Sequence, residues 1–153
     1  MSWLEADNFC KSVGAKLVEI NSREENEALV EEINNGGYKD RLMYFWIGLT
    51  DANKEGTWKL ASEGADPVFL NWDRSHTRNP EPNNFGGNEH CAHIRDGPCL
   101  DWKGAWADLD CNNNTLVIEL CDNSGPIPRL QLSMNALCEH EGTCQTGSSE
   151  AGE

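Results

Sequence analysis

Oxygen-bearing side chains gather in two stretches of the sequence. Residues 81–91 read Glu-Pro-Asn-Asn-Phe-Gly-Gly-Asn-Glu-His-Cys, and residues 106–111 read Trp-Ala-Asp-Leu-Asp-Cys. Together they offer hard oxygen donors from Glu81, Asn83, Glu89 and Asp108. Calcium takes about six to eight oxygen ligands, whereas softer metals prefer thiolate or imidazole. These residues therefore predict part of a calcium site, which backbone carbonyls, water or a ligand's hydroxyls would complete.

Pro82 bears on the geometry of this group. An X-Pro bond can be cis at modest energetic cost. A cis Glu81–Pro82 bond would turn two neighbouring side-chain oxygens toward one point, whereas a trans extended segment would splay them. Pro-Asn-Asn alone is equally consistent with a surface turn. With Glu89 and Asp108 in the same chain, the metal-binding interpretation is favoured.

Composition narrows the classes of partner. The chain has 153 residues, enough for one domain, with 12 basic and 26 acidic side chains and a net charge of −14. Nucleic acids and anionic lipids require clustered Lys and Arg, so neither is an expected partner. The sequence has no apolar run long enough for a membrane span and does not begin with a signal peptide.

Seven cysteines favour disulfides, because none forms a Cys-x-x-Cys pair suited to a zinc knuckle. We therefore expect an extracellular protein, secreted or an ectodomain, whose leader is absent from this chain. Seven is odd, so at least one thiol is unpaired or pairs with another chain.

The elements that must position the donors follow from caps and periodicity. Ser2 predicts a helix start and Gly14 its stop, and Ser22–Glu25 fits a capping box that opens a second helix. Short strands are expected at 16–20, 44–49 and 116–120. From residue 50 to about 106 helical periodicity disappears, and long irregular stretches of this kind are commonly functional.

The order of these pieces resembles that of a C-type lectin domain from residue 3 to about 121. The matching segments are Trp3-Leu4-Glu5-Ala6 through Cys10, Leu17–Ile20, Trp46–Leu49, Gly56-Thr57-Trp58, Asn71-Trp72, Glu81-Pro82-Asn83, Glu89-His90-Cys91 and Trp106-Ala107-Asp108 with Cys111. The resemblance implies an α+β fold with two helices, two small antiparallel sheets and a long calcium-binding loop. The family's usual N-terminal strand hairpin is missing here.

In that family a Glu-Pro-Asn loop implies mannose-type sugars, including glucose, N-acetylglucosamine and fucose. Two sugar hydroxyls replace water on the calcium ion, donate to carboxylates such as Glu81 or Glu89, and accept from an amide such as Asn83. The expected partners are thus glycans, bound through Glu81, Asn83, Glu89 and Asp108. Ala107 stands where the family has Asn, which removes one calcium ligand and one donor to the sugar, so binding should be weaker.

A second calcium site occurs in many relatives. Asp51 and Glu55 match its first two ligands, while Asn84 and His90 stand where acids are common. The resemblance also implies a Cys91–Cys111 disulfide, and a second from Cys10 to the last strand, where Cys121 is the available partner.

The C-terminal part departs from the pattern. Residues 122–136 read as a linker and residues 137–153 as a partial start of an epidermal-growth-factor-like module with a disordered tail. This division predicts a lectin domain over residues 1–121, within a larger multidomain protein.

The sequence also bears on two other classes of function. His90 and His93 do not suit a joint zinc site, because strand positions three apart point to opposite faces, and no substrate cleft is evident for a carboxylate pair such as Glu81 and Glu89. An enzyme is therefore not expected. The stronger alternative is a lectin-like domain that binds a protein or mineral surface without sugar, favoured by Ala107 and the acidic charge.

Overall fold

The computed structural model describes residues 1–35, 43–96 and 104–118, and short strands between residues 121 and 139. Two α-helices, α1 (Trp3–Ser12) and α2 (Arg23–Ile33), lie within this part of the chain. Ser2 caps α1 in a full capping box with Glu5, and Gly14 follows the helix at a φ of 73°. Ser22 caps α2 by accepting from the Glu25 N–H, while the Glu25 carboxylate accepts from the Asn21 N–H. Both predicted helix starts are confirmed.

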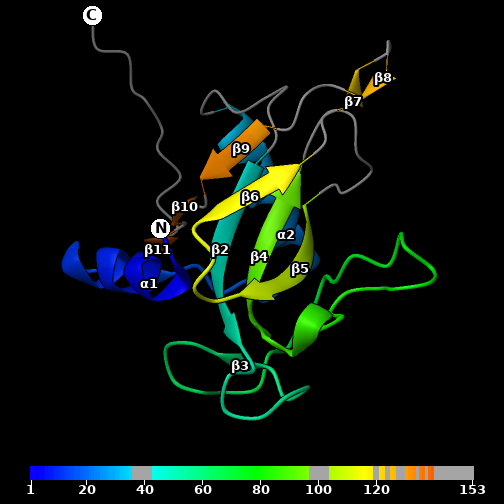
Figure 1. Cartoon of the computed structure of the whole chain (residues 1–153). Coiled ribbons are helices and arrows are strands. Elements are labelled where there is room, and N and C mark those ends of the chain that lie inside the picture. The colour runs from blue at the N-terminus through cyan, green and yellow to red at the C-terminus, as the bar shows by residue number, and fades with distance from the viewer. Residues whose placement is uncertain are drawn as a thin grey trace, which may run out of the picture.

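The largest sheet has five strands and carries the site. Its order is β10 (Asn135–Ala136), β2 (Met43–Thr50), β4 (Glu89–Asp96) and β5 (Ala105–Asp110), with β3 (Lys59–Leu60) pairing to β2. The pairs β2–β4 and β4–β5 are antiparallel, and β10 runs parallel to β2. Figure 1 shows α2 behind this sheet and α1 at its side.

Smaller two-stranded sheets complete the described elements. The first pairs β1 (Lys16–Leu17) with β11 (Cys138–Glu139), the second β6 (Thr115–Ile118) with β9 (Leu130–Ser133), and the third β7 (Cys121–Asp122) with β8 (Gly125–Pro126). Within the predicted strand at 116–120, residues 116–118 pair with β9, and residues 119 and 120 lie outside the described residues. The pairing of β10 with β2 and of β11 with β1 joins residues beyond 121 to the strands of the domain.

Tryptophans build the core beneath the irregular stretch. Trp58 and Trp72 have ring centroids 4.6 Å apart, and Trp72 meets Trp106 edge-on at 6.1 Å. Trp46 and Trp106 are almost completely buried. Burial of rings this large contributes a large share of the hydrophobic stabilisation. The stretch from 61 to 88, which has little regular secondary structure, is thus anchored from below by aromatic packing.

Trp106 also ties the sheet to α2. Its indole N–H donates to Asn26 Oδ1 at 2.8 Å, and Asn26 Nδ2 donates to the Gly104 carbonyl at 3.1 Å. Gly104 has a φ of 72°, and a Cβ there would lie 2.5 Å from a Val30 methyl group. The start of β5, which leads to Asp108, is therefore held against the helix.

Candidate functional site

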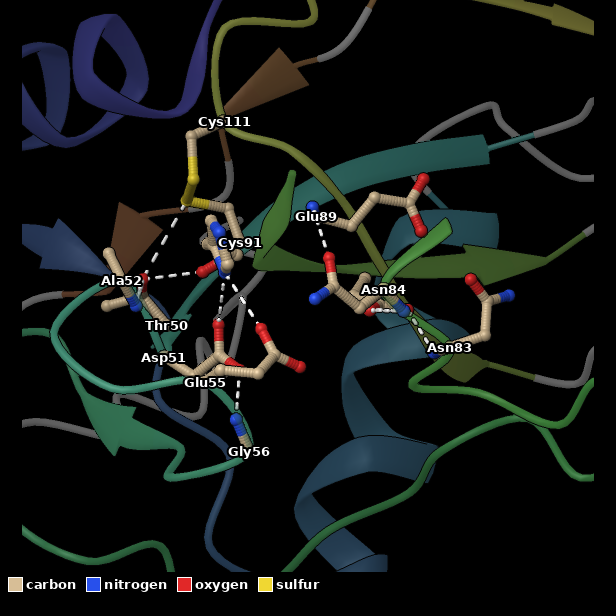
Figure 2. A network of polar contacts seen from close by, with 12 residues as sticks. Thr50, Asp51, Ala52, Glu55, Gly56, Asn83, Asn84, Glu89, Cys91 and Cys111 are labelled. Atoms are coloured by element: carbon tan, nitrogen blue, oxygen red, sulfur yellow. Dashed lines mark hydrogen bonds and ion pairs between the residues drawn. A yellow bond between two sulfur atoms is a disulfide. The ribbon is translucent and has the colours of Figure 1, made fainter. Parts of the chain in front are cut away.

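Asp108 organises the loop that precedes β4. It lies on β5 and is 3% exposed. Its two carboxylate oxygens accept from the backbone N–H groups of Asn83 and Asn84, at 2.9 and 2.7 Å. Figure 2 shows Asn83 and Asn84 close to Glu89. Asp108 thus fixes the loop backbone across 24 or 25 residues of sequence, a role that sequence analysis did not assign to it.

The loop is closed by further bonds to its own side chains. Phe85 N–H donates to Asn83 Oδ1 at 2.8 Å and to Glu89 Oε2 at 2.9 Å, and Glu89 N–H donates to Asn84 Oδ1 at 3.0 Å. Asn84 adopts a left-handed conformation with φ 45°, which Asn tolerates better than most residues. The Glu81–Pro82 peptide bond is cis. Glu81, Asn83, Glu89 and Asp108 therefore lie in one small region, as the sequence predicts.

The carboxylates of this region, Glu81, Glu89 and Asp108, repel one another. Burial raises the pKa of Glu81 to about 8, supported by its contact with the Asp108 carboxyl group and by the charges of Asp108 and Glu89. Arg95, with one nitrogen 3.6 Å from Glu81 Oε1, opposes this rise. Burial also raises the pKa of Glu89, again with Asp108 contributing. A cation between these three carboxylates would reduce their mutual repulsion.

One buried oxygen atom of this group supports calcium as the ion that fits it. Glu81 Oε2 is buried and finds no hydrogen-bond partner within the described part of the chain. A buried, unsatisfied carboxylate oxygen costs free energy, and a hard cation satisfies such an oxygen directly. Ala107, beside Asp108, is 1% exposed and has no side-chain oxygen to add. Glu81, Asn83, Glu89 and Asp108 are accordingly the residues that could hold the ion.

An open polar pocket adjoins this group. Its volume is about 340 Å³, and its lining consists of His76, Arg78, Asn79, Glu81, Asn83 and Arg95. Arg95 donates to Asp73 at 2.6 Å, so the guanidinium is held in place between Asp73 and Glu81. Sequence reasoning missed Asp73 and Arg95, since neither belongs to the Glu-Pro-Asn segment.

A second cluster forms around His90. His90 Nδ1 lies 3.0 Å from Asp51 Oδ1 and 3.3 Å from Glu55 Oε2, and Asp51 Oδ2 accepts from the Gly56 N–H at 2.7 Å. The candidate ligand atoms of Asp51, Glu55 and His90 all lie within 4.8 Å of one another. Figure 2 places Asn84 beside Glu89, apart from Asp51 and Glu55. The structure thus brings Asp51 and Glu55 together with His90, while Asn84 bonds within the first loop.

The two histidines of β4 point to different surroundings. His93 is buried between Tyr44 and Trp46, with ring centroids 6.0 and 6.2 Å away. Burial lowers its pKa to about 3, with a smaller contribution from the charge of Arg95. His90 and His93 thus lie in separate surroundings, and the absence of a metal ion shared by them stays an expectation.

The disulfide that joins the two halves of the site is present. Cys91 and Cys111 are bonded, with their Cα atoms 5.1 Å apart. It connects β4, which carries Glu89 and His90, to the end of β5 beyond Asp108. Cys10 is also disulfide-bonded, but the side chains of Cys121, Cys138 and Cys144 lie outside the described residues, as does Cys99. The predicted Cys10–Cys121 pair is therefore still a prediction.

Comparison with known proteins identifies the family. The model of the Lectin C-type domain matches residues 1–122. The chain belongs to the C-type lectin domain family. This match ends at residue 122, near the predicted boundary at 121, although β10 and β11 continue the domain's sheets beyond it. The tail from residue 140 onward, and with it most of the predicted growth-factor-like start, lies outside the described residues.

Individual relatives support the same family assignment. The chain is 36% identical over 113 residues to asialoglycoprotein receptor 2 of Rattus norvegicus, covering 72% of this chain and 32% of the receptor. It is 30% identical over 115 residues to a perlucin-like protein of Mytilus galloprovincialis, covering 75% and 66%. The chain thus spans about a third of the receptor and two thirds of the perlucin-like protein.

A solved structure supports the same fold. The carbohydrate-recognition domain of the mouse scavenger receptor C-type lectin superposes with a TM-score of 0.56 at 29% identity, covering 73% of this chain and 75% of that one. The predicted C-type lectin-like α+β fold is confirmed. The part of this chain that the structure describes contains no helix with the length and apolar character of a membrane span.

Proposed function

We propose that this chain is a calcium-dependent carbohydrate-binding module that recognises mannose-type sugars through two neighbouring hydroxyls. Mannose, glucose, N-acetylglucosamine and fucose are the ligands in question. The observation that carries the proposal is the convergence of Glu81, Glu89 and Asp108, with one buried Glu81 oxygen left without a partner in the described residues. Membership of the lectin family agrees with it.

The calcium ion, when bound, would supply the charge and open coordination positions at which two sugar hydroxyls dock. The chain's own residues determine which sugar fits. The carboxylates of Glu81 and Glu89 accept hydrogen bonds from hydroxyls, and the Asn83 amide offers a donor. Asp108 holds the backbone of Asn83 and Asn84 in place, so that these groups are positioned before the sugar arrives.

The open pocket gives the sugar room. Glu81 and Asn83 are part of its lining, so a sugar held by these two residues extends toward His76 and Arg78. Phe85 is 75% exposed beside the loop and offers an apolar surface to a sugar ring. We expect recognition to occur outside the cell, in a secreted protein or a receptor ectodomain, and without catalysis.

The direct test is retention on mannose-agarose in the presence of calcium. We expect release both by a chelator and by free mannose, and no retention of Glu81→Gln. The matched control is Glu63→Gln, which removes one exposed carboxylate in the stretch between β3 and β4. Retention that a chelator does not affect would contradict the proposal.

The alternative of protein or mineral recognition rests on Ala107 and on the net charge of −14. It predicts no release by mannose, together with adsorption to calcium carbonate. A glycan array with the calcium-loaded protein then separates the two, because only sugar recognition gives signals that Glu81→Gln removes.

A further inference from the structure

The cluster of Asp51, Glu55 and His90 differs chemically from the all-oxygen group around Asp108. Calcium is a hard ion that coordinates oxygen, whereas an imidazole nitrogen is a preferred ligand of zinc and related transition metals. An imidazole nitrogen at the centre of the second site therefore fits calcium poorly. The expectation of calcium on Asp51 and Glu55 rests on the family resemblance alone. The donor atoms of this cluster favour a different kind of metal ion.

We propose that Asp51, Glu55 and His90 form a binding site for a zinc-like divalent transition metal ion. Zinc binds His nitrogen and Asp or Glu oxygen, and its open sites combine three protein ligands with water at the fourth position. One nitrogen and two carboxylate oxygens would supply those three ligands here. With zinc–ligand bonds of about 2.0–2.1 Å, neighbouring ligand atoms in a tetrahedron lie about 3.3 Å apart. His90 Nδ1 already lies 3.0 Å from Asp51 Oδ1 and 3.3 Å from Glu55 Oε2. Binding requires the release of any proton on Nδ1, and the ligand atoms of Asp51 and Glu55 lie within 4.8 Å of each other.

Elements from two parts of the chain hold these ligands in position. Asp51 directly follows β2 and its side chain is buried, and its second oxygen accepts from Gly56 N–H. His90 lies on β4, where its backbone carbonyl accepts from the Asp51 N–H at 3.1 Å and from the Thr50 hydroxyl at 2.6 Å. The two ligands are therefore joined by hydrogen bonds of main chain and side chain. Figure 2 shows Asp51 and Glu55 turned toward the same point.

The site is open to an incoming ion on one side. The side chains of His90 and Glu55 are 31% and 55% exposed, whereas that of Asp51 is 1% exposed. A buried anchor with two accessible ligands permits entry of a hydrated ion and leaves a position for water. We expect metal binding at this site to be independent of sugar binding. Glu89 and His90 are neighbours in sequence, but they belong to different clusters.

The experiment uses the full chain with metals removed and accessible thiols blocked by N-ethylmaleimide, because an unpaired cysteine also binds zinc. Cobalt(II) is added first, since it reports a tetrahedral site by its visible absorption, and zinc is then titrated by calorimetry. We expect one cobalt ion per chain with tetrahedral absorption, displaced by one equivalent of zinc.

Four variants decide the outcome. His90→Gln and Glu55→Gln should each weaken zinc binding by at least about 100-fold, since even the partners of metal ligands are commonly worth 10–100-fold. Glu63→Gln removes an exposed carboxylate outside this cluster and should leave zinc binding unchanged. His90→Asp, an all-oxygen set, should lose zinc and gain calcium. Circular dichroism is used to check that each variant is folded. Glu55→Gln is the variant least expected to unfold, because the Glu55 side chain is more exposed than that of His90.

Zinc affinity that is the same in wild type, His90→Gln and Glu55→Gln would overturn the proposal, as would the absence of tetrahedral cobalt absorption. Loss of mannose binding in Glu81→Gln has no bearing on it. The two sites can therefore fail separately.

Discussion

The two acidic clusters include successive residues at the start of β4, Glu89 and His90, yet they differ in how their negative charge is compensated. Around Asp108, carboxylates face one another, and Arg95, which lies 3.6 Å from Glu81, is shared with Asp73. Around Asp51, the imidazole of His90 stands between the two acids. We therefore expect the first cluster to need an added cation, whereas the second contains a basic group between its acids. Family resemblance alone would have treated both as calcium sites.

The largest effect should come from removing what both clusters share. Replacing Cys91 and Cys111 together by serine opens a bridge with a sequence separation of 20 residues, which should lower the free energy of unfolding by about 3 kcal/mol. Chemical denaturation measures this loss. Because β4 and β5 then separate more easily, calcium and zinc binding should weaken together. Unchanged calcium affinity in this variant would show that the first cluster does not depend on the link between the strands.

Asp108→Asn should sharpen the contrast between the clusters. It removes a carboxylate that accepts from two backbone N–H groups and faces Glu81. We expect calcium affinity to fall about 100-fold, equivalent to roughly 2.7 kcal/mol. Zinc affinity at Asp51, Glu55 and His90 should be unchanged. Calorimetric titration with each metal measures both, and an equal loss of the two affinities would contradict the separation of the sites.

The pH dependence of the metal-free protein should expose the first cluster's need for a cation. Burial raises the pKa of Glu81 from 4.5 to about 8. The folded chain therefore keeps a proton that the unfolded chain loses, and stability falls as pH rises between these values. Allowing for partial solvent access, the loss is on the order of 2 kcal/mol.

Thermal unfolding from pH 5 to 8.5 with and without calcium measures this loss. Glu81→Gln should remove it, and calcium should remove it too, because the ion favours the ionised carboxylate. His93 contributes a pH dependence of stability with the opposite sign, and neither Glu81→Gln nor calcium should affect it. Burial lowers its pKa from 6.5 to about 3, so its contribution is present above pH 6.5 and is lost as pH falls toward 3. Identical profiles for wild type and Glu81→Gln would contradict the crowded-carboxylate interpretation.

The smallest effect should come from the second cluster in the absence of metal. His90→Gln loses the contacts of the imidazole with Asp51 and Glu55, and a hydrogen bond of this kind contributes about 1 kcal/mol. Chemical denaturation of the metal-free variant measures the change, with Glu63→Gln as the control. Mannose retention of His90→Gln should be unaffected, and loss of this retention would show that the two clusters are coupled.

Local features of the sequence were sufficient for the helix starts and for the set of acids. Ser2 and Ser22 cap their helices by bonds to residues three positions away, so the caps can be read directly from adjacent residues. The Glu81-Pro82-Asn83 segment and the Cys91–Cys111 pair were likewise predictable, because the resemblance rests on ordered short motifs. The calcium and sugar assignments are still proposals.

The tertiary structure decided how these groups meet. The contact between His90 and Asp51 spans 39 residues and arises because β2 and β4 are paired at that end of the sheet. The control of the loop by Asp108 depends on the position of β5, and the pairing of β10 and β11 with distant strands has no local signal at all. Sequence determines which chemical groups are available over a few residues. Contacts between strands far apart in the chain depend on register and packing, which no short motif specifies.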